Sequence, residues 1–114
     1  MDNDCLFCRI VAGEIPADVV HRADGFMAFR DIAPKAPVHI LVIPERHVAS
    51  LDEVGALDAD ERARMLLFIA DVAERAGLVE PGYRVTTNTG PDALQSVFHL
   101  HWHVLGGTRL SSSM

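Results

Sequence analysis

The chain has 114 residues, of which 49% are hydrophobic and 23% charged, and its formal net charge at pH 7 is −6. This length is typical of one globular domain with a sizeable core, and we expect residues 1–114 to form it. The negative charge and the absence of any basic run argue against a nucleic-acid partner, because such binding neutralises many backbone phosphates.

The N-terminal stretch MDNDCLFCRI is acidic and lacks the basic start and apolar run of a secretory signal. No apolar stretch approaches the roughly 18 residues of a membrane span, so we expect a cytoplasmic protein without a membrane partner. Asp4 is expected to cap a short helix that runs through Ala12 and ends at Gly13 and Pro16.

Cys5 and Cys8 are the only cysteines of the chain, and two residues separate them. In a reducing compartment this spacing indicates metal binding or redox chemistry rather than a structural disulfide. The pair alone leaves both alternatives open, together with two plain buried thiols.

The first half of the chain after this helix is rich in strand-forming residues. Asp24 and Gly25 form a turn between two short strands, and Pro34 and Pro37 enforce a loop before a β-branched run. Three strands are therefore expected, over Val19–Arg22, Phe26–Asp31 and Val38–Ile43.

Two capping boxes follow. Ser50 and Glu53 indicate one brief helical turn, and Asp58 and Glu61 open the main helix, which should run to about Ala76 and stop at Gly77. Its apolar face is formed by Met65, Phe68, Ile69, Val72 and Ala76. That face is widened by Leu66, Leu67 and Ala70. The wider face fits a deeply buried helix, and it also fits contact with a partner subunit, which is the interpretation we favour.

The last third predicts two more strands, over Tyr83–Asn88 and Val97–Leu105, the second stopped by Gly106 and Gly107. Strands, one long helix and strands again, with short connections, favour an α+β class over a parallel sheet. We expect a five-stranded antiparallel sheet with one long helix and one or two short ones.

The segment QSVFHLHWHVLGG places histidines at alternate positions 99, 101 and 103. On a strand they would share one face at spacings of about 6.5–7 Å, with apolar packing on the other face from the residues between them. Three alternating imidazoles favour a site, either a metal centre or a nucleophilic and phosphate-binding row. The absence of Asp or Glu over 94–107, together with the neutral donors Gln95 and Ser96, suits an oxyanion.

Three blocks carry a resemblance to a known family: CLFCRIVAGEIP, AFRDIAPKAPVHILVIPERHV and GYRVTTNTGPDALQSVFHLHWHVLGG. The last contains a His-x-His-x-His-x-x pattern, and the chain resembles the histidine triad (HIT) superfamily and its Hint-like nucleotide-binding branch. The resemblance implies one HIT domain and a homodimer whose sheets join across the twofold axis, a common self-complementary arrangement.

The resemblance also implies an activity. Hint-like proteins are purine nucleoside phosphoramidases, nucleotidyl hydrolases that release nucleoside monophosphate through a covalent nucleotidyl-histidine without a catalytic cofactor. His101 would be the nucleophile, with His103 and His39 contacting phosphate and relaying protons. Two alternatives remain at this point: hydrolysis of dinucleoside polyphosphates, or a nucleotide-binding scaffold with incidental turnover.

The substrate contacts implied by the resemblance involve the phosphate, the ribose and the purine. Asn88, Ser96 and Gln95 would serve the phosphate, and Asp31 the ribose hydroxyls. The base pocket would be lined by apolar residues that composition alone assigns to the core: Phe7, Ile10, Ile15, Phe29 and Ile32.

Some members of the superfamily hold a structural zinc, and the matching residues here are Cys5, Cys8, His47 and His99. A Cys₂His₂ set is closed and tetrahedral, hence structural rather than catalytic. Departures from the branch are Leu94, where glycine is common, and Arg30, where histidine or leucine is common. His21 matches no family position and is expected on a strand surface.

Overall fold

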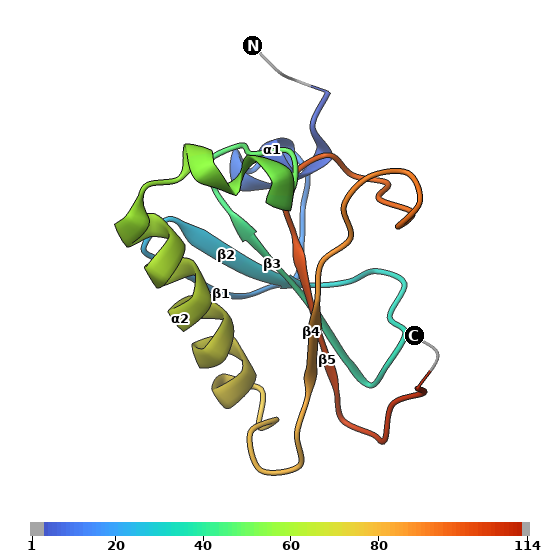
Figure 1. The fold of residues 1–114 in the computed structure, drawn as a ribbon. Helices are drawn as coiled ribbons and strands as arrows, with labels where there is room; N and C mark the ends of the chain where they lie inside the picture. Colours follow the sequence, from blue (N-terminus) through green and yellow to red (C-terminus); the bar gives the residue numbers. More distant parts are fainter. Residues whose placement is uncertain (1–3, 113–114) are drawn as a thin grey trace.

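The computed structural model describes residues 4–112, in which five strands form one antiparallel sheet ordered β1-β2-β3-β5-β4 (Figure 1). Their order with the helices along the chain confirms the predicted α+β class. No helix in this part of the chain is both long and apolar enough to cross a membrane. The elements are α1 Leu6–Val11, β1 Val19–Ala23, β2 Phe26–Arg30, β3 Val38–Pro44, the 3₁₀ helix η1 Leu51–Ala56, α2 Ala59–Arg75, β4 Arg84–Thr86 and β5 Trp102–Gly106.

β3 is the middle strand of the sheet, as its β-branched sequence predicts. It pairs with β2 on one side and β5 on the other, and Ile40 lies opposite Val104 while Leu41 lies opposite His103. Because side chains alternate along a strand, Ile40 and Val104 point to one face and Leu41 and His103 to the other. This register therefore places His103 on the face of Leu41.

α2 covers the face of Ile40 and Val104 (Figure 1). It begins at the predicted capping box, in which the Glu61 N–H donates to Asp58 at 2.7 Å and the Asp58 N–H donates to Glu61 at 3.0 Å. The predicted inner face is buried at Met65, Phe68, Ile69 and Val72. Only its last residue, Ala76, is partly buried. Leu66 and Leu67 are 60% and 69% exposed, so the chain by itself does not bury the widened face.

α1 covers the opposite face, where Phe7 joins an apolar cluster with residues of β2 and β3. The prediction that Asp4 caps this helix is wrong. The helix begins at Leu6, its N-cap is Cys5, and the Cys5 sulfur accepts a hydrogen bond from the Cys8 N–H at 3.3 Å. The second cysteine is thereby held close to the first.

β5 begins at Trp102, five residues later than predicted, and β4 is limited to Arg84–Thr86. Beyond Trp102 the partner strand runs into Pro44, which has no N–H to continue the ladder. The Leu100 N–H bonds instead to the Val48 carbonyl at 2.7 Å, in the loop after β3. The segment before β5 is therefore anchored to a loop and is not a strand.

Two smaller expectations also change. Glu53 accepts a hydrogen bond from the Ala49 N–H rather than from Ser50, so Ser50 caps η1 without a reciprocal box. His21 faces α2 rather than solvent, since its ring stacks on Phe68 at a centroid distance of 5.2 Å and lies 3.3 Å from the Asp71 carboxylate.

Candidate active site and metal centre

The three alternating histidines lie on one side of the molecule although only His103 belongs to a strand. The Phe7 ring meets both His99 and His101 edge-on, at centroid distances of 6.0 and 5.1 Å. The rings of His101 and His103 are 5.2 Å apart. The predicted common face is therefore confirmed, but the predicted strand geometry is wrong for the first two. Among the residues between them, Leu100 and Val104 are buried and Trp102 packs against the core, whereas Phe98 is 59% exposed, contrary to the expected packing.

His101 is buried, and a backbone group orients its ring. Its Nδ1 lies 2.8 Å from the His99 carbonyl oxygen. A carbonyl only accepts, so Nδ1 carries the proton and donates, which leaves a lone pair on Nε2. A neutral imidazole fixed in this tautomer presents a nucleophilic nitrogen.

His39 and His103 form a directed hydrogen-bonded pair. The Lys35 N–H donates to His39 Nδ1 at 3.1 Å, so the proton of neutral His39 lies on Nε2. His39 Nε2 is 2.8 Å from His103 Nδ1, and it donates there. The proton of neutral His103 consequently lies on Nε2. Asp31 stands beside the pair, with a carboxylate oxygen 3.4 Å from His39 Nε2.

Burial keeps this pair uncharged at neutral pH. Burial, together with the neighbouring His101 and His39, lowers the pKa of His103 to about 4. Burial also lowers the pKa of His39, and the positive charge of Lys35 adds to the effect while Asp31 opposes it. The pair is thus poised to gain a proton when a negative charge enters.

A cavity of about 460 Å³ opens beside these rings. His101 and His103 line it together with most of the residues that the sequence predicts to contact substrate: Phe7, Ile10, Ile15, Phe29, Asp31, Ile32, Asn88, Gln95 and Ser96. His39, which the sequence also predicts to contact the phosphate, is buried behind His103 and does not line the cavity. The side chain of Ile32 lies fully exposed at the rim. Lys35 and Leu94 also line the cavity, although the sequence predicted no substrate contact for either of them.

The amide group of Gln95 faces the loop rather than the cavity. Its oxygen accepts from the Gly90 N–H at 2.9 Å, and its nitrogen donates to the carbonyls of Ala49 at 2.8 Å and Val97 at 3.1 Å. These bonds hold the loop that carries Ser96. The phosphate contact expected of this side chain is therefore replaced, in this structure, by loop positioning.

A second group of side chains lies at the other end of the histidine row. The donor atoms of Cys5, Cys8, His47 and His99 all lie within 4.8 Å of one another. Three sulfur–nitrogen separations are 3.3, 3.3 and 3.5 Å. Tetrahedral zinc, with Zn–S near 2.3 Å and Zn–N near 2.0–2.1 Å, places sulfur and nitrogen ligands about 3.5 Å apart. The four residues therefore fit a zinc ion.

His99 has the tautomer that such a centre needs. Its Nε2 lies 2.7 Å from the Pro44 carbonyl, so Nε2 donates and the Nδ1 lone pair faces both sulfurs. The side chain is fully buried, and burial lowers its pKa to about 4, which keeps the ligand form neutral. The sequence contained no signal for the Pro44 carbonyl, which lies 55 residues away.

Comparison with known proteins adds a separate line of evidence. The model of the HIT domain matches residues 12–110. An uncharacterised HIT-like protein of Synechococcus elongatus is 48% identical over 97% of this chain and 96% of its own length. A purine nucleoside phosphoramidase of Escherichia coli is 41% identical over 96% of this chain and 92% of its own.

Two further relatives bear on the metal group and on the fold. A 14 kDa zinc-binding protein of Zea mays is 40% identical over 96% of this chain and 87% of its own. The crystal structure of a HIT family hydrolase from Legionella pneumophila superposes with a TM-score of 0.90 at 42% identity, covering 96% of this chain and 97% of that one.

Proposed function

The chain belongs to the histidine triad (HIT) family, in its Hint-like branch, and from that premise we propose that it is a purine nucleoside phosphoramidase. It would release nucleoside monophosphate through a covalent nucleotidyl-histidine. The observation that carries the proposal is the His101 ring, whose Nδ1 is bonded to a carbonyl, so that the neutral ring has its lone pair on Nε2, beside a nucleotide-sized cavity.

In the first step, His101 Nε2 attacks the α-phosphorus and the P–N bond breaks. The departing amine needs a proton. A phosphate beside His103 raises the proton affinity of the His39–His103 pair, so the pair takes up one proton with the substrate and His103 delivers it to the amine. The amine leaves neutral, and the nucleotide remains on His101.

In the second step, water attacks the phosphorus and displaces His101 Nε2. The His39–His103 pair accepts the proton that the water loses, which restores the charge of the pair before transfer. Nucleoside monophosphate and neutral His101 result. No step requires a metal, which agrees with placing the zinc-type ligands at the other end of the row.

The cavity supplies the remaining contacts in this proposal. Asn88 and Ser96 donate to phosphate oxygens where charge builds up, and Asp31 accepts from the ribose hydroxyls. Asp31 is already oriented, because one carboxylate oxygen accepts from the Ala33 N–H at 2.8 Å. The purine lies among the apolar residues Phe7, Ile10, Ile15, Phe29 and Ile32.

We test the assignment by replacing His101 with asparagine and following an adenosine phosphoramidate. Turnover should fall by at least about 10³-fold, because both chemical steps use this ring. Binding of adenosine monophosphate should survive. His21→Gln removes a histidine from the α2 side and should leave turnover intact. Unchanged turnover in His101→Asn, or no nucleotide trapped on wild-type His101 while product accumulates, would refute the mechanism.

Cys5, Cys8, His47 and His99 would hold a structural zinc. When bound, the ion would tie α1 to the segment before β5, whereas the peptide that carries the His99 carbonyl is also held without it, by the Leu100 N–H bond to Val48. The proposed location is the cytoplasm, where thiol ligands stay reduced.

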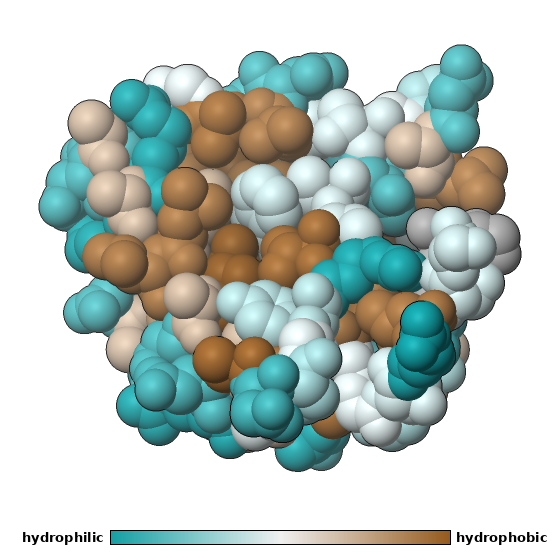
Figure 2. Space-filling view, turned by 60° about the horizontal axis from the view of Figure 1, so that its bottom comes forward, coloured by the Kyte–Doolittle hydropathy of each residue, from teal (hydrophilic) through white to brown (hydrophobic). Residues whose placement is uncertain are grey.

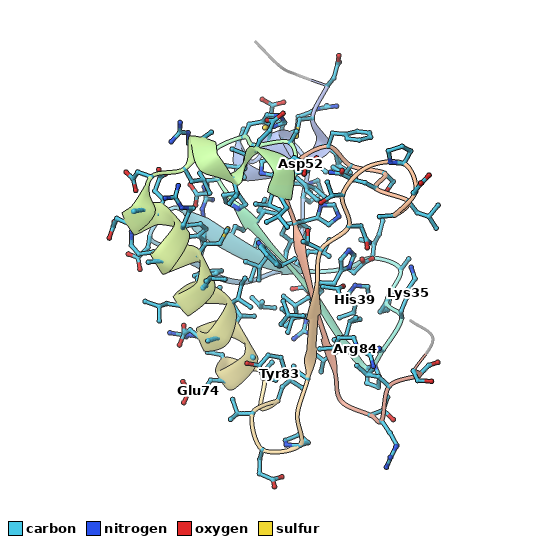
Figure 3. All side chains as sticks on the ribbon, in the orientation of Figure 1. Lys35, His39, Asp52, Glu74, Tyr83 and Arg84 are labelled. Atoms are coloured by element: carbon cyan, nitrogen blue, oxygen red, sulfur yellow. The ribbon has the colours of Figure 1, made fainter. Side chains whose placement is uncertain are left out.

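We also propose a homodimer. β4 is one of the two edge strands of the sheet, and an open edge invites pairing with another chain. Figure 2, which brings forward the end of the molecule that holds the 77–83 loop, shows a broad band of exposed apolar residues. Exposed apolar side chains include Leu66 and Leu67 on α2 and Val79 and Tyr83 after it. Tyr83 lies between α2 and β4 (Figure 3). Sedimentation should give a dimer, and Leu67→Glu should shift it toward monomer.

A further inference from the structure

Lys35 is the only lysine of the chain, since every other basic side chain except histidine is an arginine. It lies in the loop between β2 and β3, lines the cavity, and stands beside His39 on the side of the molecule away from α2 (Figure 3). A lysine presents a compact charge on a flexible stem and can meet an anion in several geometries, whereas an arginine prefers a planar one.

The backbone of this loop is fixed while the Lys35 side chain is left available. The Lys35 N–H bonds to His39, the Ala33 N–H bonds to Asp31, and Pro34 restricts the chain between them. The Lys35 side chain is exposed and forms no ion pair within residues 4–112. Most arginines in the same range are paired with a carboxylate, Arg75 with Asp71 at 2.8 Å for example.

An unpaired cation here opposes the proton uptake proposed above. The charge of Lys35 lowers the pKa of both His39 and His103, which opposes the proton that this pair must gain. A bound anion next to Lys35 would cancel that repulsion. In the mechanism proposed above, the α-phosphate has its own partners in His101, His103, Asn88 and Ser96, all of which line the cavity, so the exposed Lys35 is available for a second negative group.

Building on the proposed function, we propose that Lys35 recognises an acidic group on the amine that departs, so that the preferred phosphoramidate carries a carboxylate on its leaving group. The carboxylate would lie outside the α-phosphate, against the Lys35 ammonium. Binding of such a substrate neutralises the cation as the reaction begins. Lys35 is thus a specificity-determining residue and takes no part in bond breaking.

The test compares two adenosine phosphoramidates that differ in one charge: the alanine conjugate with a free carboxylate, and the same conjugate with a methylamide. Lys35→Met keeps the length of the side chain and removes the charge, and Lys35→Arg keeps the charge. Arg75→Met is the matched control, because it removes one cation from α2 on the other face of the sheet.

We expect Lys35→Met to lower kcat/KM roughly 5- to 20-fold for the carboxylate substrate, mainly through KM, and less than about twofold for the methylamide. Lys35→Arg and Arg75→Met should keep the wild-type preference, and raised salt should weaken it. Equal losses on both substrates would place Lys35 at the α-phosphate and overturn the inference, as would no loss on either. If wild-type protein hydrolyses neither substrate, the proposed function itself fails.

Discussion

The two ends of the histidine row use the same residue type in opposite ways. At the first end His99 donates from Nε2 to the Pro44 carbonyl and turns Nδ1 toward two sulfurs, and at the second His101 donates from Nδ1 to the His99 carbonyl and leaves Nε2 as the base. At the first end, called the enclosed end, the donor atoms of Cys5, Cys8, His47 and His99 lie within 4.8 Å of one another, and the second, called the open end, lines the cavity. Backbone carbonyls thus assign opposite tautomers to residues two positions apart, and the tautomer suits His99 to the proposed metal site and His101 to the proposed nucleophilic attack.

The largest expected effect tests whether the enclosed end is structural. Cys5→Ser should abolish stoichiometric zinc and lower the free energy of unfolding by about 3–5 kcal/mol, because metal binding energy becomes folding energy and Cys5 also caps α1. Elemental analysis and thermal unfolding with and without chelator give the result. At low temperature, folded variant should retain most of its turnover. Wild-type protein that contains no zinc, and is indifferent to chelator, would contradict the metal assignment.

The open end should make stability depend on pH. The pKa of His103 is lowered from 6.5 to about 4, so the unfolded chain binds this proton first as pH falls. The contribution of His103 is therefore fully present above pH 6.5 and is lost as pH falls to about 4, by about 3 kcal/mol. Urea unfolding of wild type and His103→Asn at pH 7 and pH 4.5 isolates this residue, since acid effects on the metal end occur in both. Equal losses in the two proteins would contradict the account.

Much of the fold and of the histidine row could be predicted from sequence, because those features depend on local patterns. Features that depend on distant partners could not. The caps of α2, the β-branched run of β3 and the spacing of the histidines are local patterns, and each led to the correct element or grouping. The start of β5 depended instead on Pro44 and Val48, far away in the chain.

The same limit applies inside the site. Except for His39, the residues predicted to contact substrate line one cavity, but the amide of Gln95 is held by three backbone groups that no nearby sequence pattern predicts. Tautomers and side-chain directions come from such tertiary partners. The sequence shows that Lys35 is the only lysine of the chain. Its position beside the histidines could be known only from the folded loop.

A pair of serine variants sharpens the division between stability and chemistry. Ser96 lines the cavity, so Ser96→Ala should lower kcat/KM by about 10- to 100-fold with little change in stability. Ser50 caps η1 through the Asp52 N–H at 3.1 Å, so Ser50→Ala should cost about 1 kcal/mol of stability without altering turnover. Steady-state kinetics and denaturant unfolding on both variants make the comparison. The reverse pattern would remove Ser96 from the proposed phosphate site.

The smallest effect concerns Leu94, at the mouth of the open end. Its φ is +63° and its side chain is 84% exposed, so a leucine occupies left-handed backbone with little packing in return. Leu94→Gly should raise the free energy of unfolding by about 1 kcal/mol, because relief of the φ strain exceeds the extra chain entropy of glycine. Leu94→Ala retains the strain and should change stability by less than about 0.5 kcal/mol.

Leu51 provides the control, since it is also exposed, at 42%, and is not among the residues with positive φ in the described range. Leu51→Gly should destabilise the protein, as glycine does where its freedom is not needed. If Leu94→Gly is destabilising as well, the left-handed leucine is held by packing that its exposure does not reveal. If it is stabilising and also changes the choice of leaving group, stability has been given up at the open end for substrate contact, whereas changes at the enclosed end should only weaken the fold.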